Sequence, residues 1–273
     1  MKKMIHTLFV VFLALPFLAI GQNETSVASE KKWAMTFDVS TESNFYEFSS
    51  PDHSASTGAE ITTMYTSDDK INAGFTFGAN KDLTAERAET LNDTTLFVGK
   101  KLKDWNDITS LLGLVKVTLP TNETSRDVNT LRAGLTLSTA LKSDLKSIHL
   151  KYVEFKYTLS GSLYFHKYTS SIDGVPNNQK RLGNTFLFTY SPFEKTAFSY
   201  EFSVAQKWTY FGRTDGPSYG NTLSVAQTLS KNTELDIGIS NRGNVYKANG
   251  IDNNLSIYDS ATATVFVEFI FQL

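Results

Sequence analysis

The sequence has no cysteine among its 273 residues. This absence excludes disulfide scaffolds, cysteine-ligated zinc or iron–sulfur sites and thiol nucleophiles. An excess of charge of one sign is also lacking, because 26 basic side chains stand against 28 acidic ones and the formal net charge is −2. That balance gives neither the basic field of a nucleic-acid-binding protein nor an acidic tail. Apolar residues, at 41%, are too many for a disordered chain and too few for a bundle of membrane helices. The aromatic share of 13% fits a β-protein.

The N-terminus has the pattern of a secretory signal peptide. Two lysines precede residues 4–20, which form an almost continuous apolar run. Ala19 and Gly21 then supply the small side chains that a signal peptidase reads. The sequence therefore predicts a signal peptide over residues 1–21 and secretion through the inner membrane.

An uncleaved N-terminal membrane anchor is the alternative interpretation of this segment. Pro16, near the end of the apolar run, favours cleavage instead. Residues 22–31 are polar and too few to plug a barrel, so we interpret them as a short periplasmic segment. Residues 32–273 then form the folded domain.

Beyond the signal peptide, no stretch approaches the roughly 20 apolar residues that a spanning helix needs. Apolar and polar side chains alternate instead, most regularly in residues 33–40, 71–80 and 153–166. Successive side chains of a β-strand point to opposite faces, so each segment has one apolar and one polar face. No segment shows a comparable helical period, and the sequence predicts an all-β fold.

Twelve segments are predicted as strands. They cover residues 32–47, 57–66, 70–80, 94–103, 109–119, 128–141, 149–166, 181–190, 195–211, 218–229, 233–244 and 255–273. An even number of strands returns the chain to the side from which it started. The predicted domain is thus consistent with a barrel whose two ends lie in the periplasm.

The links between these strands alternate in length. The short links are residues 67–69, 104–108, 142–148, 191–194 and 230–232. The long, polar links are residues 49–56, 81–93, 120–127, 167–180, 212–217 and 245–254. A soluble sandwich gives no reason for this alternation. An antiparallel, up-and-down transmembrane β-barrel does, because its periplasmic turns are short and its outer loops are longer.

The composition of the two strand faces favours a membrane barrel over a soluble sandwich or a lipocalin-like barrel. The polar face is rich in small residues, such as Thr222, Ser224 and Thr262, and carries charges in mid-strand. Aromatic residues gather in two bands, with Phe45 and Trp208 towards the long links and Trp33 and Trp105 towards the short ones. Two aromatic bands are typical of the interfacial girdles of a membrane barrel.

The mature chain resembles the outer-membrane β-barrel proteins of Gram-negative bacteria, and in particular porin-like barrels. The most specific local feature is the end of the sequence, where apolar residues alternate up to the terminus. These residues are Val265, Val267, Phe269, Phe271 and Leu273. They are similar to the signal that the barrel-assembly machinery reads, although the family usually ends on Phe or Trp. The resemblance implies an outer-membrane location, contact with lipid and lipopolysaccharide, and delivery by periplasmic chaperones.

Assigning the inner face as the polar one predicts a set of charged side chains that line the lumen. They are Asp38, Glu60, Lys116, Arg132, Glu154, Lys156, Glu201, Lys207, Asp236, Arg242 and Glu268. Six acids and five bases form no ring of one sign, so strong ion selectivity is not predicted. Two interpretations stay open: the charges pair to hold the wall together, or they form a constriction that orients a polar solute.

Catalysis is not predicted. A hydrolase triad needs a histidine beside its nucleophile, and the chain after the signal peptide has only His53, His149 and His166. None of them lies in a recognisable phospholipase or protease pattern, so we expect no enzyme, no cofactor and no metal.

The leading hypothesis is a passive or weakly selective channel for small hydrophilic solutes, with no nucleic-acid partner. The alternative is a structural or adhesion barrel with a filled interior and functional surface loops. An outer-membrane enzyme is the least favoured interpretation.

Overall fold

The computed structural model describes residues 32–84, 87–105, 108–145, 150, 152–214, 216–247, 252–260 and 262–273. The predicted signal peptide, the segment 22–31 and His149 lie outside the described residues.

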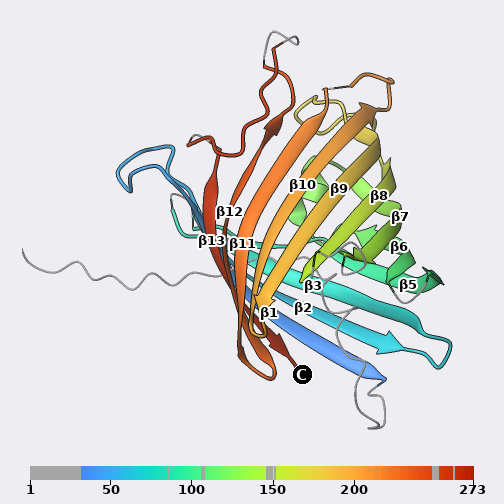
Figure 1. Ribbon diagram of the computed structural model, residues 1–273. Helices are drawn as coiled ribbons and strands as arrows, with labels where there is room; N and C mark the ends of the chain where they lie inside the picture. Colours follow the sequence, from blue (N-terminus) through green and yellow to red (C-terminus); the bar gives the residue numbers. More distant parts are fainter. Residues whose placement is uncertain are drawn as a thin grey trace, which may run out of the picture.

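Twelve long strands form one closed antiparallel barrel, with a thirteenth, short strand beside it (Figure 1). The strands are β1 (Trp33–Asn44), β2 (Ala55–Thr66), β3 (Ile71–Asp82), β4 (Glu89–Leu91), β5 (Thr94–Trp105), β6 (Thr109–Leu119), β7 (Leu131–Asp144), β8 (Val153–His166), β9 (Asn178–Phe193), β10 (Thr196–Thr209), β11 (Ser218–Ser230), β12 (Thr233–Asn244) and β13 (Thr264–Gln272). Each long strand pairs with the next long strand in the chain, and β13 pairs with β1 to close the barrel. The three-residue β4 pairs with β3 only. This is the up-and-down topology that the sequence predicts.

The links keep the predicted alternation of short turns and long loops. The turn between β2 and β3 is closed by Ser67, whose carbonyl accepts a hydrogen bond from the Lys70 N–H (2.9 Å) and whose Oγ accepts one from the Ile71 N–H (3.1 Å). A π-helical turn, η2 (Thr124–Val128), lies in the long link between β6 and β7. No helix in the described part of the chain is long and apolar enough to cross a membrane.

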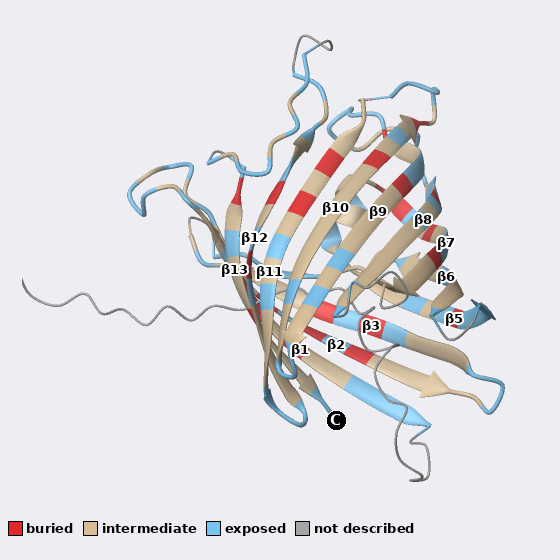
Figure 2. Cartoon of the chain, viewed as in Figure 1, coloured by how far each residue is buried: buried red, intermediate tan, exposed pale blue. Residues whose placement is uncertain are grey.

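Burial is inverted relative to a soluble protein. Buried residues lie as separate bands along the strands (Figure 2), and most of them are polar. Large apolar side chains in mid-strand are exposed, such as Leu137 (56%), Val98 (49%) and Leu223 (48%). Exposed apolar positions on a closed barrel form its outer face, and the alternate positions form its inner face. An apolar outside and a polar inside are the arrangement of a barrel surrounded by lipid.

The last strand is shorter than the sequence predicts, because it begins at Thr264 and not at residue 255. Side chains of the outer face hold the preceding segment in place. The Nδ2 groups of Asn221 and Asn241 each donate a hydrogen bond to the Ser256 carbonyl (2.8 Å), and the Ser256 N–H donates to the Tyr219 hydroxyl (3.2 Å). These bonds satisfy the N–H and the carbonyl of Ser256, which takes part in no strand pairing.

Candidate functional site

Four of the carboxylates on the inner face lie where the first two strands of the barrel meet the last two. Asp38 is on β1, Glu60 on β2, Asp236 on β12 and Glu268 on β13. Asp236 and Glu268 are direct cross-strand partners, and Ser40, two residues after Asp38, is opposite Glu268. We call these four residues the acidic wall.

The acidic wall is deeply buried. Glu268, Asp38 and Glu60 are 2%, 3% and 7% exposed. One carboxylate oxygen each of Asp38, Asp236 and Glu268 has no hydrogen-bond partner among the described residues. Lys116, on β6, is the base whose charge attracts Glu60 across the interior. No group of three or more histidine, aspartate or glutamate residues in the described chain has the geometry to hold a metal ion. The wall is therefore a concentration of acidic side chains on the inner face.

The strands from β7 to β10 carry inner charges of both signs. The Lys142 Nζ lies 2.9 Å from the Glu154 Oε2, and Lys142 is the cross-strand partner of Lys156. Leu187, on β9, is the partner of Lys156 on one side and of Glu201 on the other. Acids and bases thus alternate over these strands, whereas no carboxylate of the acidic wall forms an ion pair with a base of the described residues.

Two bases face each other near the long-loop end of the barrel. Arg181, on β9, is the direct cross-strand partner of Lys207, on β10, and both side chains are exposed. No acidic side chain among the described residues forms an ion pair with either of them. Both line a cavity of about 340 Å³ together with His166, Tyr164 and Asp93. We call this cavity the mouth cavity.

Three long links are joined by hydrogen bonds beside the mouth cavity. The Ser125 Oγ donates to the Asp93 Oδ2 (2.7 Å), and the Asn177 Nδ2 donates to the Asn129 carbonyl (2.8 Å). We call these links the loop cluster, made of residues 91–93, 121–130 and 167–177. Because polar side chains tie the three links together, the cluster forms a fixed side of the cavity.

Two of the ion pairs lie at the long-loop end of the barrel, outside the membrane-spanning segments: one joins the end of β3 to β4, and the other lies in η2. They join Lys81 to Glu89 and Arg126 to Asp127. In each pair, the hydrogen bond from the base lowers the pKa of the carboxyl group. All four side chains are exposed to solvent, so these pairs contribute little to stability.

The described histidines take part in packing and hydrogen bonding at the loop end. The ring of His53 packs against Phe48 in a tilted arrangement, with 4.7 Å between centroids. The His166 N–H donates to the Tyr210 hydroxyl (3.0 Å), which in turn donates to the Tyr164 carbonyl (2.8 Å). Among the described residues, neither histidine ring is hydrogen-bonded to an acid or a serine, as a hydrolytic triad requires.

The predicted lining residues Arg132 and Arg242 are exposed, and their role stays a prediction. Arg132 lies at a break in the register of β7, between Leu131 and Ala133, where the alternation of faces is interrupted. Arg242 is the cross-strand partner of Gly220.

The sequence prediction omits several inner-face charges, among them Lys142, Arg181 and Glu234. Lys142 lies one residue beyond the predicted strand 128–141, in the predicted short link that follows it. Arg181 is the first residue of its predicted strand, where the face is hardest to assign. Glu234 is two residues from Asp236 and shares its face, a relation that the period of two would have revealed.

Two inner aromatic rings were also missed. Phe97 is the cross-strand partner of Gly74, and Phe266 is the partner of Gly238. A Cβ atom on Gly74 would lie 2.7 Å from the Phe97 Cζ, and one on Gly238 would lie 2.5 Å from the Phe266 Cζ. Each ring therefore lies directly over its glycine, a pairing that covers the glycine backbone.

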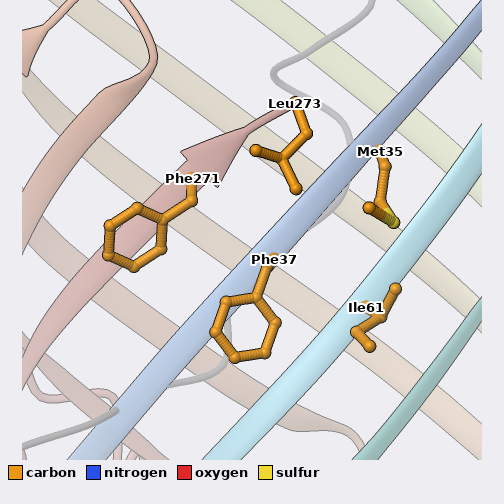
Figure 3. Close-up of a pocket in the computed structure, with 5 residues that line it drawn as sticks. All are labelled: Met35, Phe37, Ile61, Phe271 and Leu273. Atoms are coloured by element: carbon orange, nitrogen blue, oxygen red, sulfur yellow. The ribbon is translucent and has the colours of Figure 1, made fainter.

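An apolar hollow of about 470 Å³ lies on the outer face next to the C-terminus. It is lined by Met35 and Phe37 of β1, Ile61 of β2, and Phe271 and Leu273 at the end of the chain (Figure 3). The rings of Phe37 and Phe271 stack at 6.2 Å between centroids. The lining is entirely apolar, as expected of a surface that meets lipid.

Comparison with solved structures agrees with this geometry. The structure is similar to that of an outer membrane channel from Pseudomonas putida F1, with a TM-score of 0.63 and 11% sequence identity. The match covers 92% of this chain and 100% of that one. It matches the NanC porin over 87% of this chain and 98% of that one, with a TM-score of 0.55 and 10% identity. The chain has the fold of a porin-like outer-membrane β-barrel. No family model and no curated protein matches the sequence.

This fold and its surface together locate the protein. The apolar outer face needs lipid around it, and barrels of this kind reside in the outer membrane. The predicted fold class and outer-membrane location are confirmed.

Proposed function

We propose that this barrel is a passive, weakly selective channel for small hydrophilic solutes. The observation that carries the proposal is the polar inner face, on which the acidic wall lies at the seam of the barrel and mixed charges lie on the strands across from it. A solute between them meets charge on both sides, which orients polar molecules without strongly selecting one ionic sign.

The side chains between the charged groups support a water-filled interior. The inner positions of β11 are small, namely Gly220, Thr222, Ser224 and Ala226. Barrels of about eight strands are filled by their own side chains, and those of 16 or more strands hold wide channels. Twelve strands with small inner residues on one wall fit a narrow channel between these limits.

A non-transport barrel is the second candidate, and two inner rings favour it. Phe97 and Phe266 lie inside the barrel over Gly74 and Gly238, and the loop cluster lies beside the mouth. In that case the lumen would be closed and the long loops would carry the function.

Single-channel recording with a matched pair of variants separates the two candidates. Ala226→Trp adds an indole to the inner face, whereas Val225→Trp adds one to the neighbouring outer position, where Val225 is already 40% exposed. We expect the folded wild type and Val225→Trp to conduct equally and Ala226→Trp to conduct less. Absence of conductance in the wild type, folded as judged by heat-modifiable migration, would contradict the channel.

We also infer that the end of the chain guides assembly. Val265, Val267, Phe269, Phe271 and Leu273 alternate with inner residues, and Phe269 stacks on Phe271 at 6.5 Å between centroids. An exposed apolar stripe on the last strand offers an edge that the assembly machinery and periplasmic chaperones could bind before the barrel closes. Lipid, including lipopolysaccharide in the outer leaflet, would then surround the finished barrel.

A further inference from the structure

We propose that the mouth cavity binds a small hydrophilic carboxylate, through Arg181 and Lys207. This inference deepens the proposed channel function by naming the class of solute that enters from the loop side, and it rests on that function. The juxtaposition of two bases on neighbouring strands, inside a cavity, is the observation from which it starts.

Two like charges opposite each other in a sheet are destabilising. Arg181 and Lys207 are direct partners on the inner face, and no acid of the described chain pairs with them. By contrast, Lys142 of β7 forms an ion pair with Glu154 of β8. The unbalanced pair is therefore a place where an anion gains from both charges at once.

The position of Arg181 suits a ligand in the cavity. A Cβ atom on Gly183 would lie 3.9 Å from the Arg181 Cζ, so the guanidinium lies along the inner face, over a residue without a side chain. Its planar fork matches the two oxygens of a carboxylate, and the Lys207 ammonium adds a point charge beside it.

The charge count of the cavity favours a monoanion. Asp93 is the acidic residue of the lining, and its carboxylate is already engaged by the Ser125 Oγ (2.7 Å) and the Asn122 N–H (3.1 Å). Two bases and one acid leave one positive charge. A single carboxylate neutralises that charge, whereas a phosphate dianion would overcompensate it.

The rest of the lining suits a hydroxylated molecule. Asn178 lines the cavity, and its Oδ1 is buried without a hydrogen-bond partner among the described residues. Tyr164 and Ser171 also line the cavity, and their hydroxyls can exchange hydrogen bonds with the hydroxyls of a solute. The volume of about 340 Å³ is at the lower end for ligand pockets, which limits the solute to a small one.

Equilibrium dialysis of radiolabelled gluconate against the full barrel, folded in detergent, tests the site without requiring conductance. We expect saturable binding of gluconate that weakens with added salt, and none of sorbitol, its uncharged counterpart. Arg181→Gln and Lys207→Gln should each weaken binding by about tenfold or more. Lys231→Gln, in the turn between β11 and β12, is the matched control and should bind as the wild type does.

The outcomes separate this site from the channel itself. Gluconate binding that is absent, or that survives both cavity substitutions, overturns the site, and tighter binding of inorganic phosphate overturns the assignment to carboxylates. If the barrel conducts but does not bind gluconate, the proposed channel function stands and the proposed binding site is rejected. If the barrel binds gluconate saturably and through Arg181 but does not conduct, the binding site stands and the channel function is rejected. Heat-modifiable migration of every variant shows that each has folded.

Discussion

Replacing Glu268 by glutamine should stabilise the folded barrel. Glu268 is 2% exposed, one of its carboxylate oxygens has no partner, and Asp236 is directly opposite it. Side chains in such a pair lie about 5 Å apart, and two unit charges at that distance repel by about 3 kcal/mol at an effective dielectric constant of about 20. Glutamine keeps the shape without the charge. We therefore expect Glu268→Gln to raise the free energy of unfolding by about 1–3 kcal/mol.

Urea-induced unfolding in lipid vesicles, followed by tryptophan fluorescence at neutral pH, measures this change. The matched control is Glu154→Gln, also on the inner face, whose carboxylate is 2.9 Å from the Lys142 Nζ. Losing that partner leaves an uncompensated base, so the control should lower stability where Glu268→Gln raises it. Equal destabilisation by the two substitutions would refute the assignment of Glu268 to a position without an ion-pair partner among the described residues.

Three further changes follow from the packing. Gly238→Val would force its Cβ against the Leu223 carbonyl and the Phe266 ring and should lower the unfolding free energy by about 1–3 kcal/mol in the same assay; unchanged stability would contradict this close packing around Gly238. Phe271→Ala should slow appearance of the heat-modifiable form in cells more than Ile270→Ala, at the neighbouring inner position, and equal rates would contradict the assembly signal. Tyr210→Phe removes the hydroxyl that links the end of β8 to the segment after β10; we expect a loss of about 1 kcal/mol and faster amide hydrogen exchange at His166, and exchange as slow as in the wild type would contradict this role.

The fold could be predicted from the sequence because its strongest determinants are local. The period of two and the alternation of link lengths depend only on neighbouring residues, and both persist in the barrel. The segment 252–260 could not be placed in this way. It alternates like a strand, but its backbone is bound by Asn221 and Asn241, which come from other strands.

The candidate site was predictable in part for the same reason. A strand phase assigns Asp236 and Glu268 to one face, but it cannot say that they are direct partners, because register depends on the turn between the strands. The pairing of Arg181 with Lys207 was hidden because Arg181 lies at the edge of its predicted strand and the pair forms across a long hairpin. The pairing of charges between neighbouring strands therefore cannot be predicted from the sequence alone, because it depends on the register of the strands in the folded barrel.

The place of the acidic wall has a consequence for how the barrel forms. Its four carboxylates come from the first two and the last two strands of the chain, and β1 meets β13 only when the sheet closes. Until then, the two halves of the wall are separated by the whole length of the domain. The repulsion between them therefore adds to the final step of folding, on top of the entropy of joining distant segments. We therefore expect closure to be sensitive to charge, so neutralising one acid at the seam should speed this step while leaving the earlier hairpins unchanged.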